Sequence, residues 1–170
     1  LIVNATGDPL FLPDSSRLYL ADLRGEKHLR YVPNADHSLE GTDAFDSLLA
    51  FFGEIVEGTP RPEFTWRFEG TSSIRVRTEP GRRPSEVRLW QASNPDARDF
   101  RLETIGAAWT ASPLELQDGD VYLGSVEKPA RGWRAFFIEL TYPGTGDVPL
   151  KLTTAVRVVP VTLPHQAPQP

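Results

Sequence analysis

The sequence predicts an α/β segment followed by an all-β domain, and three observations support this division. A stiff connector rich in proline and glycine, Gly58-Thr59-Pro60-Arg61-Pro62, interrupts the 170-residue chain. Apolar residues recur at helical spacing before it and alternate with polar residues after it. Residues 1–57 carry a net charge of −6 and residues 58–170 a net charge of +1. We therefore expect an α/β segment over 1–57, a linker over 58–62, an Ig-like or fibronectin-like antiparallel β-sandwich over 63–163 and a flexible tail over 164–170.

The composition is that of a globular protein. Hydrophobic residues make up 39% of the chain and charged residues 24%, which is too apolar for a disordered protein. No apolar stretch reaches the ~18 residues that a membrane span needs. The net charge of −5 argues against nucleic acid as a partner, because nucleic-acid binders present a basic surface. Cysteine is absent, and neither a metal-ligand spacing nor a glycine-rich phosphate loop occurs, so no cofactor or metal is expected.

The chain begins inside an apolar run, Leu1-Ile2-Val3, and not with methionine. Processed domains usually begin in polar, flexible sequence. We therefore expect residues upstream of Leu1 to belong to the same fold, and any export signal to lie there as well.

The first part alternates between strand and helix signals. Leu1 to Asn4 is predicted to be the buried end of a strand, and Lys27 to Val32 alternates like a second strand. Between them, Pro13-Asp14-Ser15-Ser16 is predicted to begin a short amphipathic helix that buries Leu18 and Leu23. This order of elements is typical of an α/β fold.

The clearest helix closes the first part. Thr42 or Asp43 is predicted to cap its start, and Gly58 to end it. Its apolar residues fall on one face at a spacing of three to four, namely Phe45, Leu48, Leu49, Phe52, Ile55 and Val56.

The second part has the rhythm of an antiparallel sandwich, with turn residues between short alternating segments and no helix signal. Asp118-Gly119 and Pro143-Gly144 mark turns. A further short strand is considered at Leu114 to Leu116. The predicted strands are Glu63 to Glu69, Ser73 to Thr78, Glu86 to Ala92, Asp99 to Ile105, Asp120 to Val126, Trp133 to Tyr142 and Lys151 to Val161.

Asp8 and His37 form the candidate catalytic pair. Asp8 follows the first predicted strand and His37 follows the second. Because functional groups of open α/β sheets gather at the carboxyl ends of the strands, both can meet at one edge. A carboxylate there could hold an imidazole in the tautomer that accepts a hydroxyl proton. In α/β-hydrolases an acid and then a histidine follow the nucleophile along the chain, so we expect 1–57 to be the C-terminal segment of such a domain.

The nucleophile itself is missing. No G-x-S-x-G motif occurs in the 170 residues, and neither Gly70-Thr71-Ser72-Ser73 nor Gly124-Ser125 fits it. The serine is therefore expected upstream of Leu1.

Plainer roles exist for each of these residues. Asp8, in T-G-D-P, could be a turn residue whose carboxylate caps a nearby amide, and His37 could be a surface histidine. Asp36 is a rival acid that we expect to be solvated, because neighbouring side chains of an extended segment point apart. His28 is expected to face solvent or a partner surface, and His165 belongs to the tail.

The tryptophans are a second candidate site, because an exposed aromatic row on a sandwich could stack on sugars or peptides. Trp66 and Trp90 are instead predicted to be core residues, whereas Trp109 and Trp133 lie near loops. Three arginines on strand faces opposite apolar residues are predicted to form a solvated face, namely Arg75, Arg77 and Arg88.

Several motifs resemble those of the PhoPQ-activated pathogenicity-related protein family. The resemblance covers residues 1 to 163, and its most specific part is W-Q-A-S-N-P at 90–95 followed by A-R-D-F-R at 97–101. The other motifs are L-I-V-N-A-T-G-D at 1–8, F-L-P-D-S-S at 11–16, L-R-Y-V-P-N at 29–34 and D-H-S-L at 36–39.

The resemblance implies that the chain is the C-terminal part of a longer, exported protein similar to peptidase-like α/β-hydrolases. Carried over residue by residue, T-G-D names Asp8 as the acid and D-H names His37 as the base, while the serine has no counterpart here. A secreted or periplasmic location follows from the same resemblance. The family also includes a secreted growth-repressing protein.

Two functions are therefore expected of the full-length protein. The first is a serine hydrolase that acts on a peptide or ester bond, whose partner for this segment is the upstream remainder of the same α/β-hydrolase domain. The second is a binding or signalling protein on a hydrolase scaffold, with the β-sandwich as its interaction module.

Overall fold

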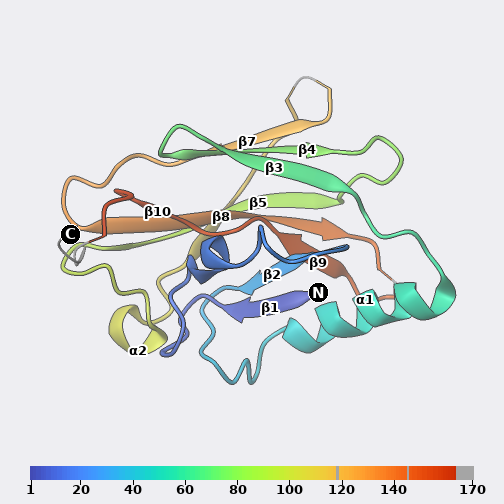
Figure 1. Ribbon diagram of the computed structural model, residues 1–170, viewed down its shortest axis with the longest axis horizontal. Helices are drawn as coiled ribbons and strands as arrows, with labels where there is room; N and C mark the ends of the chain where they lie inside the picture. Colours follow the sequence, from blue (N-terminus) through green and yellow to red (C-terminus); the bar gives the residue numbers. More distant parts are fainter. Residues whose placement is uncertain (118, 145, 164–170) are drawn as a thin grey trace.

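A computed structural model describes residues 1–117, 119–144 and 146–163. The predicted tail, with His165, and one residue of the predicted Asp118-Gly119 turn lie outside these ranges. The described chain is mostly β-sheet, arranged as two layers with few helices (Figure 1).

The larger layer is a mixed sheet with the strand order β1-β2-β9-β8-β5-β6, and β10 also pairs with β8. Only β1 and β2 are parallel, with Ile2 opposite Leu29 and Ala5 opposite Val32. The antiparallel pairing of β2 with β9 joins strands from both sides of residues 58–62 in one sheet. Its strands are β1 (Ile2–Ala5), β2 (Leu29–Val32), β5 (Glu86–Asn94), β6 (Thr110–Pro113), β8 (Trp133–Tyr142), β9 (Leu150–Thr153) and β10 (Arg157–Val159).

The smaller layer is an antiparallel sheet of β3 (Phe64–Glu69), β4 (Ser73–Thr78) and β7 (Val121–Ser125), in that order. It lies across β5 and β8, and apolar residues of both sheets form one buried cluster (Figure 1). The layers approach closely at Gly124, where a Cβ atom would lie 3.0 Å from side-chain carbons of Leu89 and Ile138. A second cluster lies on the other face of β8, where Phe137 packs with Tyr31, Phe100 and Trp109.

The crossover between the parallel strands differs from the sequence prediction. A single 3-10 turn, η1 (Ser15–Leu18), stands where an amphipathic helix was predicted. Leu18 is 72% exposed and Leu23 is 41% exposed, so the prediction that both are buried is wrong. The Asp14 side chain makes no cap hydrogen bond, because Arg98 binds it instead.

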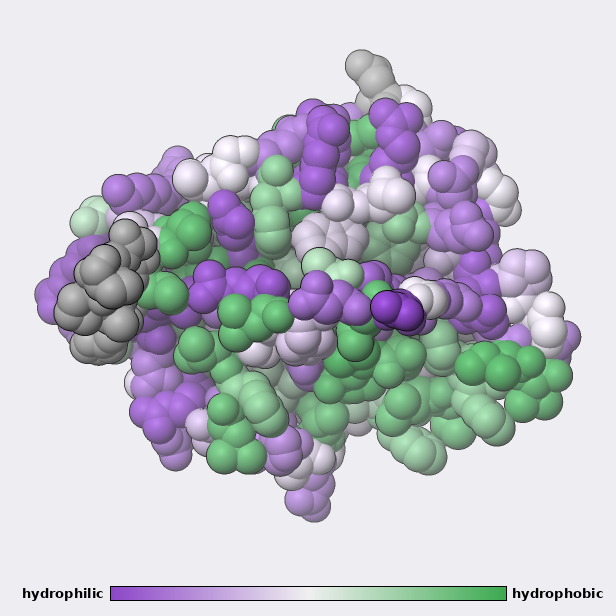
Figure 2. All heavy atoms as spheres, viewed as in Figure 1, coloured by the Kyte–Doolittle hydropathy of each residue, from purple (hydrophilic) through white to green (hydrophobic). Residues whose placement is uncertain are grey.

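The closing helix α1 (Ala44–Glu57) is confirmed, with Asp43 before it and Gly58 in a left-handed conformation after it. Its burial is unusual, however, because the face that packs on the sheet is small and polar. The buried residues of that face are Ala44, Ser47, Ala50 and Glu54, with the half-buried Phe51 beside them, whereas Phe45, Leu48, Leu49, Phe52, Ile55 and Val56 are exposed. Figure 2 shows these apolar side chains gathered over α1 at the lower right of the molecule.

The second part contains most of the predicted strands, with three local differences. The predicted strand from Asp99 to Ile105 is wrong, because the single-turn helix α2 (Leu102–Ile105) stands there. The strand considered at Leu114 to Leu116 lies earlier, as β6. The long strand predicted from Lys151 to Val161 is divided into β9 and β10.

Candidate active site

The two predicted site residues meet at the carboxyl ends of the parallel strands. Asp8 lies three residues beyond β1, and His37 lies five residues beyond β2. The Nδ1 atom of His37 lies 2.8 Å from Oδ2 of Asp8, within hydrogen-bond range. Parallel pairing of β1 with β2 brings the two loops to one edge, as the sequence predicted.

The backbone fixes the other oxygen of Asp8. Oδ1 accepts hydrogen bonds from the amides of Leu10 at 2.7 Å and Phe11 at 3.2 Å. The Asp8 side chain is only 8% exposed, whereas the His37 side chain is 56% exposed. Asp8 therefore also has the turn-capping role considered from the sequence, but only through Oδ1. A buried, oriented carboxylate thus faces an imidazole whose other edge is open to solvent.

Asp36 does not compete for the imidazole. It is exposed, and its Oδ1 accepts hydrogen bonds from the amide and the hydroxyl of Ser38 at 2.9 and 2.6 Å. These Ser38 hydrogen bonds lower the pKa of the Asp36 carboxyl. The expectation that Asp36 is solvated is confirmed.

Close backbone contacts tie the acid loop to the histidine loop. The amide of Gly7 donates to the carbonyl of Ala35 at 2.9 Å, and the amide of Asn34 donates to Oγ1 of Thr6 at 3.1 Å. A Cβ atom at Gly7 would lie 2.8 Å from that carbonyl oxygen and 2.8 Å from the amide nitrogen of Leu102. Glycine is required here for lack of space.

A third segment, residues 95–109, holds both loops from the side of the larger sheet. Asn34, at φ 55°, exchanges two hydrogen bonds with the backbone of Trp109, at 2.9 and 3.0 Å. The amide of Leu102 donates to the carbonyl of Gly7 at 2.9 Å. Arg98 binds Asp14 through both terminal nitrogens, and both side chains are nearly fully buried. We call residues 95–109 the clamp segment.

Sequence reasoning did not assign these contacts to the site. The A-R-D-F-R motif at 97–101 was used only for a family resemblance, although its residues belong to the clamp segment. The P-N pair at Pro33-Asn34 was the available signal, because asparagine tolerates the left-handed conformation better than most residues.

A buried ionic network holds the far end of the histidine loop. Arg30, buried in β2, donates to Oε2 of Glu139 at 2.6 Å and to Oδ1 of Asp43 at 2.6 Å. Lys151 donates to the other oxygen of Asp43 at 2.6 Å. Burial raises the pKa of Asp43, but the charge of Arg30 and the bond from Lys151 outweigh it and leave that pKa below its usual value. The start of α1 is therefore fastened to β2, β8 and β9.

A cavity of about 270 Å³ opens beside the acid. Residues 8–13 line one side, and Arg98 to Arg101 of the clamp segment line the other. The Phe11 ring lies 6.1 Å from the His37 ring, between centroids. The described residues thus supply space, an apolar wall and charged groups next to the pair.

The remaining sequence candidates lie elsewhere. Trp66 and Trp90 are half-buried against the core clusters, and Trp109, which lies near a loop, is buried outright. His28 is within 2.8 Å of Glu26, outside the pair. Among the described residues, no group of three or more histidine, cysteine or acidic side chains could hold a metal ion. None of the helices in the described ranges has the length and apolarity to cross a membrane.

Comparison with known proteins agrees with the motifs. A family model described as PhoPQ-activated pathogenicity-related protein matches residues 1–101, which include Asp8, His37 and Arg98. The chain belongs to this family. The PhoPQ-related family points to an exported protein.

A curated relative, autocrine proliferation repressor protein A of Dictyostelium discoideum, is 34% identical over 187 aligned residues. The alignment covers 95% of this chain and 38% of the relative, so the chain spans well under half of the relative's length. No solved structure matches the chain.

Proposed function

We propose that the chain is the C-terminal portion of a secreted or periplasmic serine hydrolase of the α/β-hydrolase type, peptidase-like or esterase-like. Asp8 is its acid, His37 its base, and the serine lies upstream. The single observation that supports this most is the 2.8 Å approach of Nδ1 to Oδ2 at the carboxyl ends of parallel strands. The shared order of acid, histidine and closing helix adds to it.

The geometry suits a proton relay at the opposite ring nitrogen. In this proposal Nδ1–H donates to Asp8, and Nε2, on the opposite side of the ring, is the proton acceptor. As the serine oxygen attacks the carbonyl carbon of the substrate, Nε2 takes the serine proton. It then gives this proton to the departing amine or alcohol, and the buried carboxylate stabilises the imidazolium formed in between. Peptide and ester bonds are both within this chemistry.

The upstream remainder of the α/β-hydrolase domain is the partner in this proposal. β1 pairs with β2 alone among the described strands, so its other edge is free to accept a further strand. The apolar face of α1 is exposed (Figure 2). Leu10, Phe11 and Leu12 of the acid loop are exposed as well. Contiguous apolar surface of this kind marks an interface. The 38% coverage of the relative leaves ample chain to fill it.

Fluorophosphonate labelling of the full-length protein tests this function. The wild-type protein is expected to be labelled, and His37→Ala to lose labelling and turnover of ester and peptide substrates. Asp36→Asn is the matched control, because it removes the neighbouring, solvated carboxylate and is expected to label normally. Unchanged labelling of His37→Ala, or no labelling of the wild type, would contradict the proposal.

A non-catalytic binding or signalling protein is the second candidate, and the relative's printed name, a proliferation repressor, favours it. In that case the sandwich strands carry the interaction. Retention of proliferation repression by an unlabelled His37→Ala full-length protein would favour this function. Loss of both labelling and repression would favour the hydrolase.

A further inference from the structure

A second cavity, of about 500 Å³, lies between the segment that follows η1 and the strand β3. It shares no lining residue with the cavity beside Asp8. Its apolar lining comes from the crossover, the smaller sheet and the segment between β9 and β10, and consists of Leu20, Ala21, Trp66, Phe68 and Ala155. Trp66 and Phe68 contact edge to face, with ring centroids 5.3 Å apart. This apolar surface fits an elongated apolar group.

Every charged side chain that lines this cavity is basic, namely Arg17, Lys27 and Arg67. Lys27 donates to the backbone carbonyls of Ala21 and Leu23, which are neutral, so its charge is not cancelled there. Arg17 lies 3.5 Å from an oxygen of Asp14, but Arg98 already binds that carboxylate through two nitrogens. The cavity therefore carries a surplus of positive charge.

Arg157 adds to this surplus from behind Phe68. Its guanidinium lies 4.6 Å from the centre of the Phe68 ring. Its Nε atom is buried and has no hydrogen-bond partner in the described part of the chain. Burial lowers the pKa of Arg157, and the nearby charge of Arg17 lowers it further.

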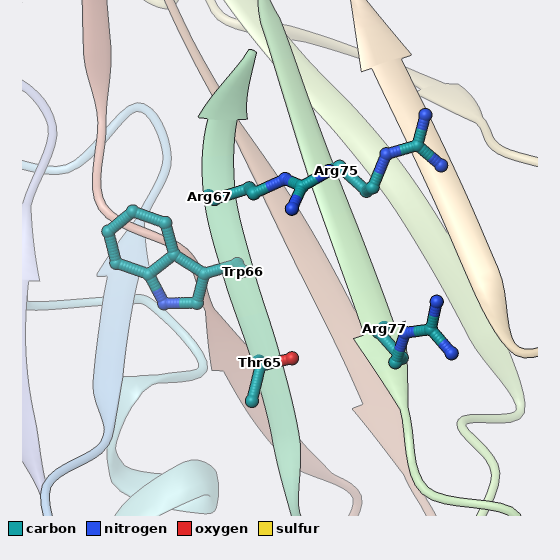
Figure 3. A pocket seen from close by; sticks show the side chains of 5 residues that line it. All are labelled: Thr65, Trp66, Arg67, Arg75 and Arg77. Carbon is teal, nitrogen blue, oxygen red and sulfur yellow. The ribbon is translucent and has the colours of Figure 1, made fainter.

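The outer face of β3 continues the positive surface. Figure 3 shows Arg67, Arg75 and Arg77 on one side of β3 and β4, while Trp66 projects on the other side. Arg67 and Arg75 are directly opposite across the strands, an arrangement that repels. Glu69 binds both at 2.6 to 2.9 Å, and these bonds hold its pKa at about 2. One carboxylate is thus shared by two arginines, and Arg77 adds a third positive charge.

We propose that this cavity binds an amphiphile that has an anionic head and an unbranched apolar chain, such as a medium-chain alkyl carboxylate. The chain lies along Trp66 and Phe68, and the head lies at Arg17 and Lys27. Burial of apolar surface favours a longer chain, by about fourfold in affinity for each CH₂ group. The basic rim selects the charge of the head. This binding is independent of the serine hydrolase chemistry.

Indole NMR signals of the 170-residue chain test the proposal at the site itself. The sequence holds four tryptophans, and Trp66→Phe assigns the Trp66 signal. Decanoate is expected to shift that signal saturably, whereas decanol and decyltrimethylammonium shift it at least tenfold less effectively. The double variant R17Q/K27Q is expected to weaken decanoate binding at least tenfold. Unchanged signals of the other three indoles report that this variant is folded.

Arg88→Gln is the matched control, because the Arg88 side chain is 43% exposed, close to the 38% of Arg17, pairs with Glu86 and lies on the other sheet. It is expected to bind decanoate like the wild type. A Trp66 signal that decanoate does not move, or that decanol moves equally, would overturn the proposal. So would tighter binding of an acidic peptide than of decanoate at Trp66, since that result would assign the cavity to a peptide.

Discussion

The corner that carries Asp8 and His37 and the outer face of α1 lie a few residues apart, yet they differ completely in packing. At the corner, three chain segments exchange backbone and side-chain hydrogen bonds, and the carboxylate is buried. On the outer face of α1, six large apolar side chains meet no described part of the chain closely enough to be buried.

The difference shows which region finds its packing contacts within the described residues and which does not. The clamp segment and the network of Arg30 and Asp43 hold both site loops without help from any other segment. The outer face of α1 lacks such a covering. We infer that the geometry of the acid and base is formed within these residues, whereas stability and nucleophile depend on the segment that covers the helix.

The largest expected effect concerns the corner. Asp8→Asn in the full-length protein should lower kcat/KM by about 10³ to 10⁴, because an amide cannot hold the imidazole in the required tautomer. Hydrolysis of an ester substrate measures it. Asp36→Asn, the adjacent carboxylate, should leave kcat/KM within about twofold. Equal losses in the two variants would show that the 2.8 Å contact has no catalytic role.

The two faces of α1 should respond oppositely to a charge. Ala50 is 1% exposed and Phe52 is 63% exposed. Ala50→Glu should lower the free energy of unfolding of this chain by about 3–5 kcal/mol, because it buries an unpaired charge. Phe52→Glu should change it by less than about 0.5 kcal/mol. Urea unfolding gives both values.

The full-length protein sharpens that test. There Phe52→Glu should become strongly destabilising, because the upstream segment now buries the site. If Phe52→Glu is as harmless in the full-length protein as in this chain, another partner or none covers the outer face of α1.

Steric crowding beside Asp8 and His37 should lower the free energy of unfolding by less than a buried charge does. Gly7→Ala places a Cβ 2.8 Å from the Ala35 oxygen and should destabilise the chain by about 1–3 kcal/mol. Gly81→Ala is the control, since no atom lies within 4 Å of its Cβ position. Thermal unfolding compares them. A neutral Gly7→Ala would mean that the two loops are not held as closely as the contacts indicate.

The smallest effect is a pH dependence of the clamp segment. The hydrogen bond from Arg101 lowers the pKa of Asp99 from 3.8 to about 2, against the opposing effect of burial. The stabilisation is therefore complete above the unfolded pKa, and it is lost as the pH falls through the folded value. Asp99→Asn should reduce the urea midpoint near neutral pH and make little difference at about pH 2. The same reduction at both pH values would contradict this assignment.

Local sequence chemistry predicted the elements and the pair well, for identifiable reasons. Asp8 and His37 follow short apolar strands, and the rule that sites lie at strand carboxyl ends needs no long-range information. Helix α1 was recognisable from its apolar residues at helical spacing and from Gly58, which ends it. The alternation of Phe64, Trp66 and Phe68 likewise marked β3 within one residue.

What sequence reasoning could not supply depends on contacts far apart in the chain. Asn34 meets Trp109 across 75 positions, and Arg30 meets Glu139 across 109. Nothing near Arg30 indicates that a partner will bury it. The exposure of the apolar face of α1 is equally non-local, because periodicity identifies a face but not its partner.

We propose that a serine of the upstream segment completes the catalytic site with His37 and Asp8. A crystal structure of the full-length protein tests it through one distance, from Nε2 of His37 to the nearest serine Oγ. We expect a distance of about 2.6–3.2 Å, with the Asp8 contact preserved on the other side of the ring. An Nε2 atom that faces solvent with no serine, cysteine or threonine beside it would contradict the claim.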